Sequence, residues 1–222
     1  MKKVIFVILL VLMFLSCGTS KKITLPDKDI KIENETVFFK NEKYTGKINL
    51  KDKNSVSGFI TFKDGQLDGP AELKNDKKQM YTKFNIVNNK FEGETVVKNT
   101  DQGINMTVNY DNGKIVKLLG DYSKTVKYDI TFIDGLANGW FESEGEKFLF
   151  SDGVLTLEED GITTEVKYYV NQETGNMGME FFINGESAGR DEKPNKIFGL
   201  EYFRIIALSS ILEENNKRKD KS

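Results

Sequence analysis

Apolar and polar residues alternate around Asp-Gly and Asn-Gly pairs through most of the chain. In the stretch ITFKDGQLDG (60–69), Ile60, Phe62 and Leu67 alternate with polar residues on both sides of Asp64-Gly65. Such a pair between alternating apolar residues is typical of a two-residue β-hairpin, because its tight turn needs positive φ at both central residues. Paired residues share a face. The pattern therefore predicts a hairpin in which Phe62 lies opposite Leu67 and Ile60 lies opposite Gly69.

The same frame recurs in seven units along the chain. With residue 65 as the reference, the equivalent positions are 42, 89, 113, 135, 153 and 185, at spacings of 18 to 32 residues. A glycine stands four residues after the reference in five of the units, where it leaves room for a large neighbouring side chain. The glycines that we expect to shape these turns are Gly46, Gly65, Gly69, Gly93, Gly113, Gly135, Gly139, Gly153, Gly185 and Gly189.

An aromatic residue, an Asp-Gly or Asn-Gly turn and the following G-x-hydrophobic-x-G resemble the MORN repeat. The similarity is to the shorter variant in secreted and lipid-anchored bacterial chains, and it covers roughly residues 36–190. It implies a mainly β fold, an antiparallel meander of about seven MORN-like β-hairpins in residues 31–190 that form an extended twisted sheet. It also implies that the protein serves as a scaffold or binding surface rather than as a catalyst. Some bacterial relatives with this repeat are named as antitoxin components of toxin–antitoxin pairs.

The N-terminus has the pattern of a secretory signal. Lys2 and Lys3 precede an apolar run over residues 4–15, which is shorter than the roughly 20 residues of a membrane span. The sequence Leu-Ser-Cys at residues 15–17 resembles the lipobox of bacterial lipoproteins. This resemblance implies a signal peptide over residues 1–16, palmitate-type acylation of Cys17 and attachment to the cell envelope. Gly18, rather than Asp, implies the outer membrane in a host with two membranes. The alternative is an ordinary signal peptide with a coincidental cysteine.

Two segments flank the repeats. Residues 17–30 are mostly polar, and we expect a flexible tether between the lipid and the domain. Residues 191–222 are expected to form an amphipathic helix and a basic tail. The helix is predicted over residues 196–215 from the helical spacing of its apolar residues, which are Phe198, Tyr202, Ile205, Leu208 and Leu212. It either lies on the sheet or binds a partner or the membrane interface.

The fifth unit breaks the pattern on its outward face. Ile133, Leu136 and Trp140 are apolar where the other units carry polar residues. A tryptophan in an exposed apolar patch is a typical interface anchor. We expect these three residues either to bind a partner or to be covered by the C-terminal helix.

Composition narrows the chemistry. The chain contains no histidine. This absence excludes imidazole general bases, Ser-His-Asp or Cys-His nucleophilic catalysis, and zinc sites with histidine ligands. Its formal net charge is −2, so there is no basic field for nucleic acid. The acidic clusters at 141–146 and 157–161 lack the dense ligand spacing of a calcium loop. We predict no metal site, no cofactor and no enzymatic activity.

Three functions remain open from the sequence. The first is a membrane-anchored, non-catalytic repeat scaffold that binds a protein or a cell-envelope glycan. The second is a carrier of lipid or another apolar ligand, with a groove lined by Phe62, Tyr110, Phe132, Phe150 and Phe182. The third is a histidine-free hydrolase, which would need two carboxylates that converge in a cleft.

Overall fold

The computed structural model describes residues 21–51, 56–193 and 200–216. The predicted signal peptide, Cys17 and the basic tail from residue 217 onward lie outside the described residues. The described chain is mainly β with one C-terminal helix, α2 (Leu200–Asn216). The strands of the large sheet are β1 (Lys21–Thr24), β5 (Gly46–Lys51), β6 (Ser57–Lys63), β7 (Gln66–Leu67), β8 (Gly69–Asn75), β9 (Met80–Val87), β10 (Lys90–Phe91), β11 (Gly93–Asn99), β12 (Ile104–Asp111), β13 (Lys114–Asp121), β14 (Val126–Ile133), β15 (Leu136–Ser143), β16 (Glu146–Phe150), β17 (Val154–Glu159), β18 (Ile162–Val170), β19 (Met177–Ile183) and β20 (Glu186–Lys193). A small separate sheet contains β2 (Ile30–Glu33), β3 (Thr36–Phe39) and β4 (Glu42–Lys43).

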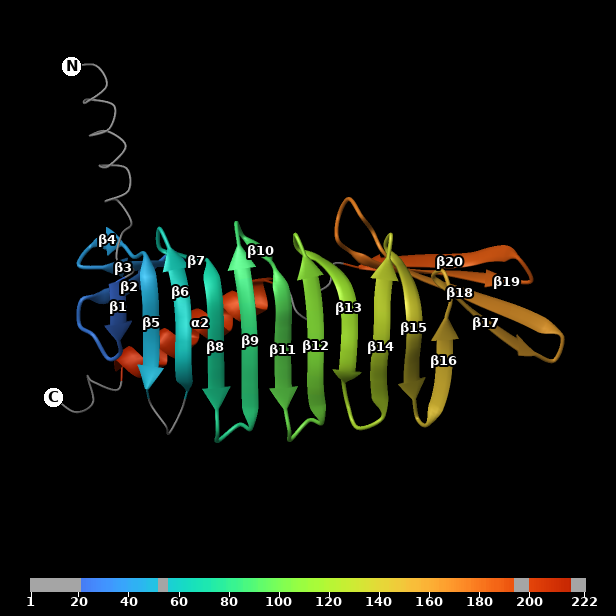
Figure 1. Cartoon of the computed structure of the whole chain (residues 1–222), viewed down its shortest axis with the longest axis horizontal. Coiled ribbons are helices and arrows are strands. Elements are labelled where there is room, and N and C mark those ends of the chain that lie inside the picture. The colour runs from blue at the N-terminus through green and yellow to red at the C-terminus, as the bar shows by residue number, and fades with distance from the viewer. Residues whose placement is uncertain (1–20, 52–55, 194–199, 217–222) are drawn as a thin grey trace, which may run out of the picture.

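The large sheet is an open antiparallel meander, as the sequence predicts (Figure 1). From β5 to β16 the long strands pair in the order of the chain, and β17 to β20 continue the same order. The two-residue strands β7 and β10 pair back with β6 and β9. The meander changes direction after β16, where Leu136 of β15 pairs with Tyr169 of β18. As a result, the last four strands run across the direction of the others (Figure 1).

The predicted turns are confirmed. Both central residues have positive φ in Asp64-Gly65, and the same holds for the equivalent pairs at 112–113, 134–135, 152–153 and 184–185. Phe62 pairs with Leu67 as expected. In the first unit the positive φ values fall one residue earlier than the frame predicts, at Lys40 and Asn41.

The predicted pairing of Ile60 with Gly69 is wrong. After Phe62 and Leu67, the register shifts, and pairing between β6 and β8 resumes at Phe59 and Glu72. Two extra residues on the second strand are accommodated by a bulge at this point, where the Asp68 amide donates to the Thr61 carbonyl at 3.2 Å. In the fifth unit, which has no such bulge, Ile130 pairs with Gly139 as the frame predicts.

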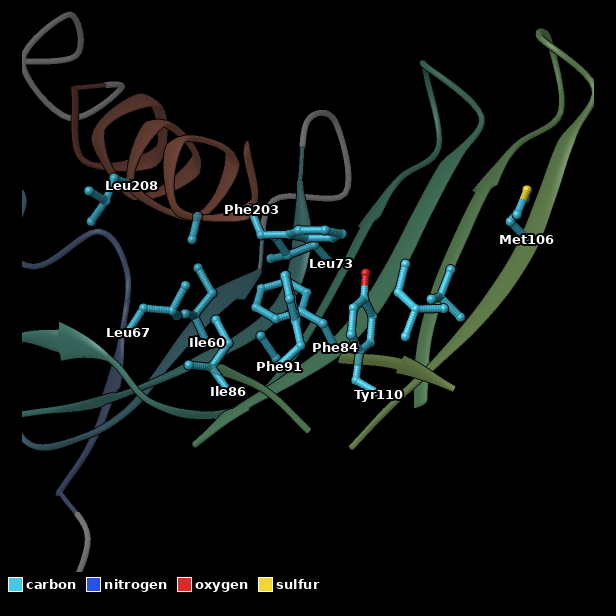
Figure 2. Packing of buried hydrophobic residues seen from close by; sticks show 14 of the residues in the cluster. Ile60, Leu67, Leu73, Phe84, Ile86, Phe91, Met106, Tyr110, Phe203 and Leu208 are labelled. Carbon is cyan, nitrogen blue, oxygen red and sulfur yellow. The ribbon is translucent and has the colours of Figure 1, made fainter. Parts of the chain in front are cut away.

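One face of the sheet, here called the core face, carries the buried residues. Ile60, Phe62 and Leu67 lie on it at 0 to 6% exposure, which confirms the alternation of the first hairpin. Helix α2 lies across the N-terminal half of the core face (Figure 1). Phe203 of α2 is fully buried, and its ring centroid lies 4.7 Å from that of Phe84 and 5.2 Å from that of Phe91 (Figure 2).

The helix packs through a different stripe from the predicted one. Phe203, Ala207 and Ile211 are buried, whereas Ile205 and Leu212 are 59% and 46% exposed. Leu208 is buried as predicted, and the side chains of Phe198 and Tyr202 lie outside the described residues. Apolar residues occur on several sides of this helix, so helical spacing alone selects more than one stripe.

Residues 21–30 are not part of a flexible tether, which corrects that prediction. Lys21–Thr24 form β1, which pairs in parallel with β5. Ile23 and Leu25 are buried in the core. The alternation of Ile23 and Leu25 with polar residues is a strand signal that was hidden by the lysines around it.

Candidate binding surface

The face opposite the core face carries an apolar row in the middle of the C-terminal half of the sheet. Leu119 of β13 pairs with Asp129 of β14, Asp129 pairs with Trp140 of β15, and Trp140 pairs with Leu149 of β16. Because directly paired residues share a face, these four side chains form one line across four strands. We call them the tryptophan row.

The apolar members of the row are accessible to solvent. Leu119 is 42% exposed and Leu149 is 65% exposed. Trp140 is half-buried, and the Lys147 ammonium lies 4.1 Å from its ring centroid. A lysine over an indole ring gains a cation–π attraction and fixes the ring in place. The row therefore presents a positioned tryptophan with the exposed Leu149 directly beside it on one side, and with Asp129 and then the exposed Leu119 on the other.

Two charged pairs lie on the same face, one that includes Asp129 of the row and one beside the row. Lys117 lies 3.6 Å from the Asp129 carboxylate, and Lys127 donates to Glu142 at 2.8 Å. The hydrogen bond that Lys127 donates to Glu142, together with the negative charge of Glu142, raises the pKa of Lys127 above its ordinary value, so Lys127 stays protonated throughout the neutral range. An apolar centre with a charged, solvated rim is the usual anatomy of a protein-binding patch.

The three residues predicted from the sequence share this outer face but do not form one cluster. Ile133 pairs directly with Leu136 near the turn, and Ile133 is 58% exposed. Leu136 is half-buried, because the Gly153 turn and Tyr169 of β18 lie against it. Asn138 separates this pair from Trp140 and uses its amide oxygen to accept from the Asp152 amide at 3.0 Å.

The prediction that the C-terminal helix covers this patch is wrong. Helix α2 lies on the core face of the N-terminal half, where Phe203 contacts Phe84 and Phe91. Trp140 lies on the opposite face, in the C-terminal half. On the core face, Phe84 and Phe91 form a buried aromatic cluster with Tyr110, and burial of this surface favours the position of the helix.

The sequence analysis missed Leu119 and Leu149. Both stand in runs of consecutive apolar residues, Leu118-Leu119 and Phe148-Leu149-Phe150. In a strand, neighbours point to opposite faces, so one residue of each run must point away from the core. Leu118 and Phe150 are buried, which leaves Leu119 and Leu149 on the outer face. The runs themselves are the signal that could have identified them.

The residues of the second function, the apolar-ligand carrier, do not line one groove. Phe62, Tyr110, Phe132 and Phe150 are buried in the core, whereas Phe182 pairs with Ser187 on the opposite face. A cavity of about 170 Å³ does lie between α2 and the sheet, bordered by Leu73, Met80 and Ile206. This volume is smaller than the roughly 300–1,000 Å³ of ordinary ligand pockets.

The described part of the chain offers no cluster of metal ligands. No three acidic or cysteine side chains gather there closely enough to hold a metal ion. The carboxylates at 144, 146 and 158–160 are exposed on hairpin turns and strand ends. Within the same residues, no helix has the length and apolarity needed to cross a membrane.

Comparison of the chain with protein-family models, with curated proteins and with solved structures gives no match. The function must therefore be argued from the surface itself.

Proposed function

We propose that the chain is a lipoprotein of the cell envelope that acts as a non-catalytic scaffold and binds another protein through the tryptophan row. A lipid on Cys17 holds it to the membrane, which is the outer membrane if the host has two. The MORN-like hairpins give the binding surface its rigidity. The observation that carries the proposal is the exposure of Leu149 beside Trp140 and of Leu119 beyond Asp129, on a face that α2 does not cover.

A protein partner fits this surface better than a glycan. A sugar ring stacks on the open face of an aromatic ring, but here the Lys147 ammonium lies over the Trp140 ring. The exposed groups beside it are leucines, which a protein partner can bury at about 25 cal/mol per Å² of apolar surface. Aromatic anchors surrounded by aliphatic contacts commonly dominate the affinity of protein interfaces.

The test is photo-crosslinking of the full-length, lipidated chain in its native cell. A photoreactive amino acid at Leu149 is expected to give one discrete protein adduct. The matched control is the same group at Lys98, which is exposed on the outer face of β11, outside the row. Trp140→Ala in the Leu149 variant is expected to weaken binding by about 30-fold, the cost of a hot spot of about 2 kcal/mol.

Two outcomes would contradict the proposal. One is an adduct that forms equally from Leu149 and Lys98, or that persists unchanged with Trp140→Ala. The other is an adduct that contains glycan and no protein, which would replace the protein partner by an envelope glycan. The anchor is tested separately with Cys17→Ala, which is expected to abolish incorporation of labelled palmitate and release the chain from the membrane fraction.

A further inference from the structure

The last four strands carry a second exposed apolar surface, on the core face of the sheet. Its members belong to β17, β18 and β19, and each is 36 to 50% exposed. They are Leu157, Ile162, Met179, Phe181 and Ile183. The strand registers place them on one face, because Ile183 pairs with Thr164, which pairs with Leu157, and Phe181 pairs with Val166. We call this surface the distal apolar face.

The distal apolar face continues the protein core. Tyr168, which shares its face, packs against Phe132 and Phe150 with ring centroids 5.6 Å apart in both cases. At the other end of the sheet the core face is covered by α2, whereas none of the described helix lies over β17–β20 (Figure 1). A repeat array needs a cover at each end to keep its core from water. Among the residues that the structure describes, the helical cover is found at one end only.

The rim of the distal apolar face is acidic. Glu159 lies at the end of β17, Glu186 pairs with Ile183, and Asp191 pairs with Met179. One basic residue, Lys193, stands on this face at the end of β20, where it pairs with Met177, and the three residues at the rim are all acidic. Symmetric pairing of two such faces would bring the acidic rims together, and like charges in contact are unfavourable. The occupant should instead be apolar with basic residues beside it.

The C-terminal helix has that chemistry on its outer side. Ile205, Ser209 and Leu212 are exposed and lie at spacings of four and three residues, which is one stripe of a helix. Directly after the helix the sequence continues with Lys217, Arg218 and Lys219. The stripe is therefore partly apolar, with the exposed Glu213 beside it and three basic residues directly after the helix.

A single molecule cannot bring these two surfaces together. Helix α2 lies over the strands near β5 and β9, and its last residues contact Asp27, at the far end of the sheet from β17 (Figure 1). More than six strands, each about 4.8 Å from the next, lie between α2 and β17, and the buried Phe203 holds the helix in its place.

We infer that a second copy of the chain occupies the distal apolar face, with the outer stripe of its α2 and its basic tail. Each molecule would then cover the open end of the next, in a head-to-tail contact. Because donor and acceptor surfaces differ, such a contact does not form a two-fold symmetric dimer, and its repetition builds a ring or an open row of molecules. The tryptophan row is on the opposite face of the sheet, so it stays available to a partner in this arrangement.

The experiment uses two differently tagged full-length chains, co-expressed in the native membrane and treated with a flexible bis-maleimide. One chain carries Leu212→Cys and the other Ile183→Cys. Mixed dimers are expected from this pair, and neither variant alone should form dimers above the background of the parent chain, whose only cysteine is Cys17. Phe181→Lys in the Ile183→Cys chain is expected to abolish the mixed dimer, and raising the salt to 0.5 M should reduce its yield.

The alternatives give different products. Dimers of Ile183→Cys with itself would show a symmetric contact and overturn the inference. Equal yield from a control pair, Leu212→Cys with Leu149→Cys, would indicate crowding in the membrane and also overturn it. A yield of mixed dimer that does not change with salt would show that the basic tail is not part of the contact, and would overturn that part of the inference. The salt series needs no core substitution, so it stays informative if Phe181→Lys impairs folding.

Discussion

At the scale of single residues, Gly139 and Gly185 show that positive φ has two different consequences in this sheet. Gly139 has φ +126°, and a Cβ on it would overlap the backbone carbonyl of Asp129 on the neighbouring strand. Gly185 has φ +80° at a hairpin turn, and a Cβ there would meet no atom within 4 Å. The first glycine is required by both conformation and contact, the second by conformation alone.

Alanine at the two positions separates these effects. Gly185→Ala is expected to lower the free energy of unfolding by about 1 kcal/mol, the cost of a left-handed conformation for an L-residue. Gly139→Ala should add a further ~1–3 kcal/mol, because the neighbouring strand must move. Urea denaturation measures both values. Equal losses for the two variants would mean that β14 and β15 separate without cost at this point.

Much of this residue-level detail could be predicted from the sequence. The Asp-Gly and Asn-Gly turns depend on local conformation alone, so their positions followed directly. The role of the second glycine did not, because it depends on a neighbouring strand: beside Gly69 the close side chain is Thr61 rather than Ile60. Trp140 was identified as an outward residue, whereas its lysine cover comes from Lys147 on the next strand, which a single hairpin unit does not reveal.

At the scale of elements, helix α2 was predictable in existence but not in orientation. Apolar residues at 203, 207 and 211 compete with those at 205, 208 and 212 for the buried side. The choice is made by the sheet, since Phe203 fits between Phe84 and Phe91. Arg204 then reaches Asn89 at 2.9 Å and Glu35 at 3.4 Å, next to the buried stripe.

Two alanine substitutions on the same helix test this orientation. Phe203→Ala should lower the free energy of unfolding by about 3–5 kcal/mol, because it removes a fully buried ring and leaves a cavity. Ile205→Ala should change it by about 0.5 kcal/mol or less, since Ile205 is 59% exposed. Urea denaturation of both variants gives the comparison, and a larger effect at Ile205 would restore the stripe that the sequence suggested.

At the scale of the whole molecule, the two ends of the described chain meet. The Asp27 amide donates to the Asn215 side chain at 3.0 Å, across 188 residues of sequence. Repeat units contact mainly their neighbours, so the meander could be inferred from hairpin after hairpin. A contact between the ends has no local signal, and for this reason the position of α2 was predicted on the wrong half and the wrong face.

This arrangement makes the two halves of the sheet depend differently on the helix. A chain that ends after Lys193 lacks α2, which exposes the core face around Phe84 and Phe91, whereas Ile130 and Phe132 keep their neighbours. Hydrogen exchange measured by mass spectrometry should therefore show lost protection in β8–β11 and retained protection in β14 and β15, because local stability follows local burial. Quenching of Trp140 fluorescence should stay unchanged, since α2 does not touch it. Loss of protection over the entire sheet would show that the meander folds as one cooperative unit, and retained protection in β8–β11 would show that their core face is stable without the helix.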